Sequence, residues 1–185
     1  MTTARTIEIR PAVRADTDAL CDAHVAAWRV AYRGLFPDAL LDSEEFEAGR
    51  RAIWRAARWF GDPDQQVFAA VLAGVVSGFA HVGAEREHNV LNGSGRGEVY
   101  GFYNQPSTWG SGLARASMAA AEQWLGEHGF TEATLWVLRD NPRARSFYEK
   151  SGWAWTGKES LWSGPNVAGQ PAPDPIAEVQ YARTL

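Results

Sequence analysis

Cysteine and long apolar runs are what this 185-residue sequence lacks most clearly. The single cysteine, Cys21, excludes an internal disulfide, and no group of cysteines and histidines has the spacing of a metal site, so we expect no bound metal. No apolar run approaches the length of a membrane-spanning helix, and residues 1–10 lack the hydrophobic stretch of a signal peptide. The sequence therefore predicts a cytoplasmic protein that does not act at a membrane.

Positive charge is also scarce. The chain has 18 Lys and Arg residues against 22 Asp and Glu residues, which gives a formal net charge of −4 at pH 7. Proteins that bind nucleic acid need a basic surface, so the composition argues against a nucleic-acid partner. The length suits one well-buried core and is short for two, so we expect one domain over residues 1–185.

Hydrophobic spacing predicts a mixed order of strands and helices. Two-residue alternation predicts strands at residues 6–10, 66–72, 75–82, 97–106, 131–138, 153–156 and 176–182. Helical spacing, capping residues and glycines predict helices that begin near Asp16, Ser43, Gly112 and Asn141. Residues 85–97 are expected to form a flexible connection, and residues 158–175 a long loop.

The second expected helix, from about Ser43, has two different faces. An apolar stripe is expected to face the core, formed by Phe46, Ile53, Trp54 and Ala57. Three arginines share another face, which is either a solvated surface or a ridge that binds phosphate: Arg51, Arg55 and Arg58.

Two glycines, Gly110 and Gly112, follow the strand pattern of residues 97–106 and precede an alanine-rich helix. The first N–H groups of a helix have no partners within it, and the helix dipole places positive charge there. The turn therefore suits a phosphate or pyrophosphate, although a tight turn without a ligand fits the same residues. The sequence has neither the lysine of a Walker loop nor the glycine spacing of a dinucleotide fingerprint.

A second pattern, over residues 135–153, is more distinctive. It reads LWVLRDNPRARSFYEKSGW and resembles the motif L-x-V-x-x-x-N-x-x-A-x-x-F-Y-E-K-x-G-F of the GNAT superfamily of acetyl-CoA-dependent N-acyltransferases. Residues 97–114 are similar to that family's acyl-CoA motif. In that motif an acidic residue on a strand, a Leu-Tyr-Val run and a proline precede Q/R-x-x-G-x-G/A. The resemblance implies a mixed α/β fold (α+β). Its central sheet would be mostly antiparallel, with about seven strands splayed between strands four and five, and about four flanking helices.

The resemblance implies acetyl-CoA as co-substrate and a primary amine of an unidentified small molecule or peptide as acceptor. The residues expected to contact acetyl-CoA are Phe102, Tyr103, Asn104, Trp109, Gly110, Ser111, Gly112, Leu113, Ala114 and Asn141. Two of them depart from the motif, since Trp109 stands at the Gln/Arg position and Asn104 replaces an apolar residue. The Asn104 amide is expected beside the acetyl group, on the same strand as Glu98.

Glu98 matches the family's acidic strand residue, so the resemblance implies that it is the general base; a surface glutamate is the alternative. Tyr148 matches the tyrosine that protonates the departing thiolate, and its alternative is a core tyrosine. Trp28, Tyr32 and Trp162 are expected to line the acceptor site, although each also fits simple packing.

Other features are left with a structural interpretation or stay open. His24 and His81 are expected to be core histidines, and Cys21 has no feature of a nucleophile. A homodimer is possible, because the family often forms one. The alternative function is a non-catalytic acyl-CoA-binding or regulatory module, which the departures at Trp109 and Asn104 leave open.

Overall fold

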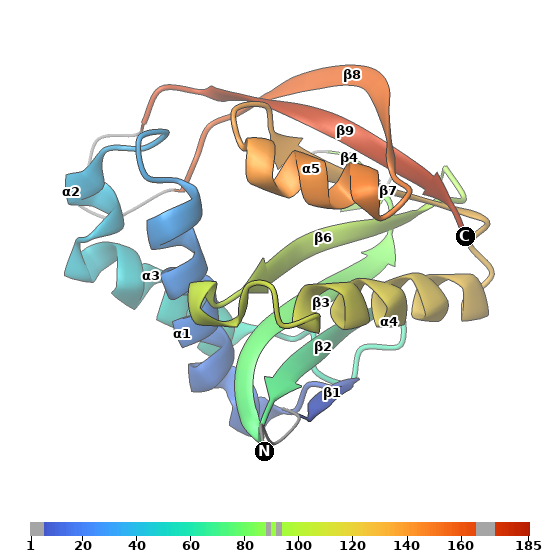
Figure 1. Ribbon diagram of the computed structural model, residues 1–185, viewed down its shortest axis with the longest axis horizontal. Helices are drawn as coiled ribbons and strands as arrows, with labels where there is room; N and C mark the ends of the chain where they lie inside the picture. The colour runs from blue at the N-terminus through green and yellow to red at the C-terminus, as the bar shows by residue number, and fades with distance from the viewer. Residues whose placement is uncertain (1–5, 88–89, 92–93, 166–172) are drawn as a thin grey trace.

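Seven strands form one sheet in the computed structural model, which describes residues 6–87, 90–91, 94–165 and 173–185 (Figure 1). The strands follow one another across the sheet in the order β1-β2-β3-β6-β7-β9-β8. Their bounds are β1 (Ile7–Pro11), β2 (Gln65–Leu72), β3 (Val75–Ala84), β6 (Gly97–Asn104), β7 (Glu132–Leu138), β8 (Ala154–Trp162) and β9 (Ile176–Thr184). A separate pair consists of β4 (Arg86–Glu87) and β5 (Val90–Leu91). The helices are α1 (Thr17–Ala31), α2 (Asp38–Leu41), α3 (Glu44–Ala56), α4 (Leu113–Glu127) and α5 (Pro142–Lys150), with 3₁₀ turns η1 (Arg14–Asp16) and η2 (Pro106–Thr108).

The sheet opens between its fourth and fifth strands, β6 and β7. These two strands are parallel and pair from Gly97↔Ala133 to Val99↔Leu135, after which they continue to Asn104 and Leu138 without pairing to each other. The other neighbouring strands of the sheet are antiparallel. The expected fold, a mostly antiparallel sheet splayed between strands four and five, is confirmed.

Helices cover both faces of the sheet, because β2 and β3 carry apolar side chains on each side. Val67 and Phe79 pack with residues of α1 and α3, whereas Phe68 and Ala80 pack with residues of α4 and α5. In Figure 1, α5, β8 and β9 lie on one side of β6, and β1 to β3 lie on the other. No helix among the described residues is long and apolar enough to span a membrane.

Capping side chains fix where two of the helices begin. The Ser43 Oγ accepts a hydrogen bond of 3.1 Å from the N–H of Phe46 at the start of α3. The Asn141 Oδ1 accepts one of 3.1 Å from the N–H of Ala144, and Pro142 is the first residue of α5. Both helix starts agree with the sequence, because these side chains satisfy N–H groups that a helix leaves without partners.

The prediction of a long loop over residues 158–175 is wrong in its first part, because β8 continues to Trp162 and pairs with β9. A register shift lies between Trp155 and Glu159, and Gly157 within it has φ of 85°. A bulge of this kind interrupts the alternation from which strands are recognised. β8 is also the edge strand and largely exposed, so no apolar face marks it in the sequence. Residues 166–172 of the expected loop lie outside the described residues.

The connection expected over residues 85–97 contains the short antiparallel pair of β4 and β5. Its residues 88–89 and 92–93 are outside the described part of the chain, and Gly97 already belongs to β6. The sequence also did not predict α2, a single turn of helix that connects α1 to α3. A segment of four residues is too short to show helical periodicity.

Of the three arginines expected to share a face, Arg51 and Arg55 lie on α3 and bind carboxylates of α1, whereas Arg58 lies beyond the end of α3 at Ala56. Arg51 lies 2.7 Å from Asp22 and 3.2 Å from Asp18, and Arg55 lies 3.1 Å from Asp18. These ion pairs favour the solvated face over the phosphate-binding ridge. The prediction of the inner apolar stripe is wrong for one of its residues, because Ile53 is 48% exposed.

Candidate active site

A cavity of about 1510 Å³ lies where β6 and β7 diverge, and it extends from the start of α4 to α1 and α3. A pocket for one small ligand measures about 300–1,000 Å³, so this volume has room for two substrates. It collects most of the residues that the sequence indicated: Trp28, Tyr32, Glu98, Phe102, Tyr103, Asn104, Trp109, Gly110, Ala114, Asn141, Tyr148 and Trp162. The remaining three, Ser111, Gly112 and Leu113, lie at the start of α4 but do not line the cavity.

The start of α4 presents backbone N–H groups that are free to bind an anion. Gly110 and Gly112 have φ of 81° and 91°, values that L-residues rarely adopt. Within the described residues, the N–H groups of Gly110, Gly112 and Ala114 donate no hydrogen bond, whereas those of Ser111 and Leu113 are used internally. Three of the five expected donors thus remain for a pyrophosphate at the positive end of the helix dipole, which fits the phosphate end of acetyl-CoA.

Trp109 holds the loop that precedes α4. Its Nε1 donates a hydrogen bond of 3.2 Å to the backbone oxygen of Asn104, the last residue of β6. The guanidinium of Arg143, in the first turn of α5, lies 3.5 Å from the centre of the Trp109 ring. Arg143 was missed by the sequence analysis. It brings to the rim of the cavity a positive charge that the tryptophan itself cannot supply.

A bulge at Tyr100 changes which side chains of β6 share a face. β3 pairs with the residues on either side of Tyr100 but skips it. Simple alternation would put Glu98 and Asn104 on one face, and the extra residue puts them on opposite faces. The Asn104 amide lies against Gly78 of β3, where an added Cβ would be 2.4 Å from the Asn104 Oδ1. The Asn104 amide therefore lies on the opposite face of β6 from Glu98, although both residues line the cavity.

Glu98 lies in the cavity wall and is only 7% exposed. Its Oε2 accepts a hydrogen bond of 2.7 Å from the backbone N–H of Arg86, and the Arg86 Nη2 lies 3.5 Å from Oε1. Burial raises the pKa of Glu98 and Arg86 lowers it, and the net effect of all the neighbouring groups is a raised pKa. A carboxylate whose pKa is raised toward neutral is a more effective proton acceptor near neutral pH.

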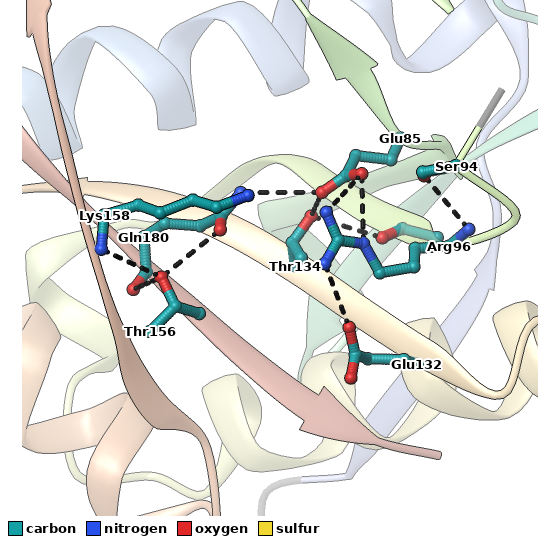
Figure 2. Close-up of polar contacts among 9 residues, drawn as sticks. Glu85, Ser94, Arg96, Glu132, Thr134, Thr156, Lys158 and Gln180 are labelled. Atoms are coloured by element: carbon teal, nitrogen blue, oxygen red, sulfur yellow. Dashed lines mark hydrogen bonds and ion pairs between the residues drawn. The ribbon is translucent and has the colours of Figure 1, made fainter. Parts of the chain in front are cut away.

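A second carboxylate, Glu85, is held by a polar network that Figure 2 shows. Glu85 accepts hydrogen bonds of 2.8 Å from the Thr134 Oγ1 and 2.8 Å from the Arg96 Nη2, and the Gln180 Nε2 lies at 3.5 Å. Figure 2 shows Glu85 between Gln180 on one side and Arg96 on the other. The negative charge of Glu85 also raises the pKa of Glu98. The sequence analysis missed both Glu85 and Arg96, which lie in the expected flexible connection.

Tyr148 is presented by α5 and is 7% exposed. Its ring packs with Phe147 and Phe102, at centroid distances of 5.6 Å and 6.4 Å. Burial, with a smaller effect of Tyr103, raises the pKa of Tyr148 well above its ordinary value of 10.0. The hydroxyl is therefore protonated at neutral pH, and the raised pKa makes it a weaker proton donor than an ordinary tyrosine.

Trp28, Tyr32 and Trp162 come together at the α1 end of the cavity. The ring of Trp28 lies 4.7 Å from that of Tyr32 and 5.6 Å from that of Trp162. Tyr32 also shares a hydrogen bond of 3.1 Å with the hydroxyl of Tyr103. Trp162 reaches this group from the end of β8 rather than from a loop. The guanidinium of Arg50, which the sequence analysis missed, lies 4.4 Å from the centre of the Trp28 ring.

His24, His81 and Cys21 show no feature of a nucleophile or a charged acid. Desolvation lowers the pKa of both histidines, that of His81 to about 3, so both are neutral at physiological pH. The His81 Nε2 is 2.8 Å from the Gln65 Oε1. Cys21 is fully buried, and burial raises the pKa of its thiol to about 11.

The sequence of this chain matches one family of transferases. Residues 25–153, more than half of the chain, match the Acetyltransferase (GNAT) family. The chain therefore belongs to that family and is an acetyltransferase.

Among curated proteins, the chain is 29% identical to the uncharacterized N-acetyltransferase YuaI of Bacillus subtilis (strain 168). The match extends over 140 residues and covers 74% of each chain. It is 36% identical over 114 residues to an aminoglycoside N(6')-acetyltransferase type 1 of Stenotrophomonas maltophilia, covering 60% of this chain and 67% of that protein.

Two solved structures share the fold and contain the co-substrate or its product. PaiA N-acetyltransferase from Thermoplasma acidophilum, in complex with coenzyme A, has a TM-score of 0.71 at 16% identity and covers 97% of this chain and 99% of that one. The acetyltransferase yncA from Salmonella typhimurium, solved with acetyl-CoA, has a TM-score of 0.64 at 20% identity and covers 97% and 94%.

Proposed function

We propose that this protein transfers the acetyl group of acetyl-CoA to a primary amine of a small molecule or peptide, by direct attack with both substrates bound. The observation that carries the proposal is the continuous cavity of about 1510 Å³, which joins the start of α4 to the aromatic residues of α1. Acetyl-CoA would enter from the α4 end and the amine from the α1 end. They would meet where β6 and β7 diverge, beside Glu98 and Tyr148.

Acetyl-CoA would bind mainly through the backbone. The free N–H groups of Gly110, Gly112 and Ala114 are the proposed pyrophosphate donors, with Arg143 adding charge beside them. The pantetheine would lie along residues 102–104 of β6, near Asn141. That edge of β6 has no strand partner among the described residues, so its backbone groups can bond an extended ligand.

The chemistry requires an acceptor amine that is neutral, and an unperturbed amine is almost wholly protonated near pH 7. Glu98 would remove that proton, directly or through a water molecule. The amine nitrogen would then bond the thioester carbon, and backbone N–H groups of β6, including that of Asn104, would bind the oxyanion. As the carbon–sulfur bond breaks, Tyr148 would give its proton to the leaving thiolate.

Thiol release from acetyl-CoA, measured across a panel of amines, tests the proposal. The panel includes aminoglycosides, because one relative bears that activity in its name, together with polyamines, amino acids and peptides. Glu98→Gln and Tyr148→Phe are each expected to lower kcat by about 10²–10⁴-fold without changing KM for acetyl-CoA. Glu127→Gln, at an exposed position of α4, is the matched control and is expected to retain full activity.

Unchanged turnover in both Glu98→Gln and Tyr148→Phe, with a good acceptor, would show that the proposed acid and base are wrong. It would leave the family assignment intact, because that assignment does not depend on either residue. Absence of thiol release with every amine would count against a primary amine as the acceptor.

A further inference from the structure

Arg50 is a cation inside the acceptor end of the cavity. It lies on α3 between Phe46 and Trp54, and both of these neighbours are buried. Its guanidinium lies 4.4 Å from the centre of the Trp28 ring and 5.6 Å from that of Phe46, and Arg50 lines the cavity. The charged group is therefore packed on aromatic rings in the cavity wall, and Arg50 is half-buried.

No carboxylate compensates this charge. Among the described residues, Arg50 makes no hydrogen bond and no ion pair, whereas its neighbour Arg51 is ion-paired with Asp18, Asp22 and Glu47. Burial lowers the pKa of Arg50. The other groups that affect this pKa are two tyrosines and a cysteine, and none of them is a carboxylate. A desolvated cation without an anion is costly, and stacking on aromatic rings offsets only part of that cost.

The groups around Arg50 that have no partner are also hydrogen-bond donors. The His24 Nδ1 lies 3.1 Å from the Trp54 Nε1, which can only donate, so the neutral imidazole carries its proton on Nε2. The His24 Nε2 and the Trp28 Nε1 are buried, and neither has a hydrogen-bond partner among the described residues. Three donor groups thus surround this end of the cavity, and none of them has an acceptor in the described part of the chain.

The carboxylates of the cavity lie instead near β6 and β9. Glu98 is bonded to Arg86, and Glu85 to Arg96. Glu178 of β9 also lines the cavity, and the charge of Glu98 contributes to raising its pKa. Among the described residues, the cavity therefore has a cation without a carboxylate partner at α3, whereas its glutamates near β6 and β9 include two that are paired with Arg86 and Arg96.

We propose that the acceptor is an amine that also carries a carboxylate, and that Arg50 binds this carboxylate while the amine extends toward Glu98. The inference rests on the proposed function and names the class of acceptor for it. A guanidinium that stacks on Trp28 keeps its N–H edge free, and that edge matches the two oxygens of a carboxylate. Amino acids and peptides have this combination of charges, whereas polyamines and aminoglycosides carry only positive charge.

Matched pairs of acceptors test the proposal directly. Each amino acid or peptide is compared with its own amide, which keeps the amine and removes the negative charge. The wild-type protein is expected to acetylate the acid with a kcat/KM about tenfold to hundredfold higher than the amide, the range expected for a hydrogen-bonded charge pair. A second pair, an aminoalkyl phosphate and its amino alcohol, gives the preference for a phosphate in the same way. A preference larger than that of the acid over its amide would overturn the carboxylate in favour of a phosphate.

Arg50→Gln is expected to abolish the preference for the acid, and Arg50→Lys to restore part of it. Neither substitution is expected to change KM for acetyl-CoA, which also shows that the variants are folded. Arg51→Gln is the matched control, because it removes the adjacent arginine from the outer face and is expected to keep the preference. Equal rates for acid and amide in the wild type, or a preference for the acid that survives Arg50→Gln, would overturn the proposal.

A binding measurement separates this proposal from the proposed function. N-acetyl amino acids and their amides are titrated into the protein in the presence of coenzyme A, with tryptophan fluorescence as the signal. Tighter binding of the acid, lost in Arg50→Gln, would support a carboxylate site even if no amine in the panel released thiol. Equal binding of acid and amide would overturn it even if acetyl transfer occurred.

Discussion

At the scale of single residues, two opposing effects set the protonation of Glu98. Burial and the nearby charge of Glu85 favour the neutral acid, whereas the guanidinium and backbone N–H of Arg86 favour the carboxylate. Burial has the largest effect, so the pKa of Glu98 lies above that of an ordinary glutamate. Arg86 therefore favours the ionised form that the proposed base requires.

Arg86→Ala is expected to raise the pKa of Glu98 further, because it removes the positive charge and keeps the backbone N–H. The acidic limb of the pH profile of kcat/KM should then move to higher pH, since a more basic medium is needed to ionise Glu98. Arg139→Ala is the control, because Arg139 pairs with Glu159 at the surface and does not line the cavity. A limb that stays in place in Arg86→Ala would contradict Glu98 as the base.

The residues of the site differ in how far the sequence revealed them. Glu98 and Tyr148 were found because each stands in a recognisable motif. Arg50 was missed, although a signal was present: it lies four residues from both Phe46 and Trp54 and thus belongs to the inner stripe of α3. The arginine-rich composition of that helix concealed it. Glu85 could not be found, because its partners come from β7, β9 and the segment before β6.

At the scale of elements, the turn before α4 depends on a residue that can adopt positive φ. Gly112→Ala is expected to lower the free energy of unfolding by about 1–2 kcal/mol, since Gly112 has φ of 91° where alanine is strained. KM for acetyl-CoA is expected to rise, because the change displaces N–H groups of the proposed pyrophosphate site. Urea unfolding and initial rates measure the two effects.

Gly126→Ala in the same helix is the matched control and should have the opposite effect on stability. An added Cβ there has nothing within 4 Å, and alanine favours the helix by about 0.5–1 kcal/mol over glycine. KM for acetyl-CoA should not change. Equal effects of the two substitutions on KM would contradict the assignment of the α4 start to the co-substrate.

Elements with local signals were predicted, and elements defined by distant pairing were not. The β2–β3 hairpin was expected from Ala73 and Gly74, which have φ of 52° and 81° as a two-residue turn requires. The extension of β8 was missed because Gly157 and the exposed edge position remove every local sign of a strand. The bulge at Tyr100 reverses the faces of β6 beyond that residue, which the alternation of the sequence does not indicate.

At the scale of the whole molecule, the proposed binding of both substrates in one cavity predicts direct transfer without an acetylated enzyme. The only cysteine, Cys21, is fully buried and its thiol has a pKa of about 11, so it offers no reactive thiolate. Initial rates measured at several concentrations of both substrates are therefore expected to give intersecting double-reciprocal lines.

Cys21→Ala is expected to lose about 1 kcal/mol of stability, because it leaves a small gap in the core, and to keep kcat/KM. Intact mass measured after incubation with acetyl-CoA alone should show no added acetyl group. Parallel lines, or an acetyl adduct that disappears in Cys21→Ala, would contradict direct transfer.

The short pairing of β6 with β7 also has a consequence for how the protein avoids unwanted association. An unpaired strand edge is normally a template on which other chains can add and aggregate. Here the unpaired edge of β6 beyond Val99 faces the cavity, and the Phe147 ring of α5 stacks on the Phe102 ring of β6 at a centroid distance of 5.5 Å. A ligand as thin as a pantetheine chain can pair with such an edge, whereas a second protein strand would have to displace α5 first. The protein thus keeps unpaired backbone groups for a narrow ligand, while the limited space beside them excludes the protein strands that would cause aggregation.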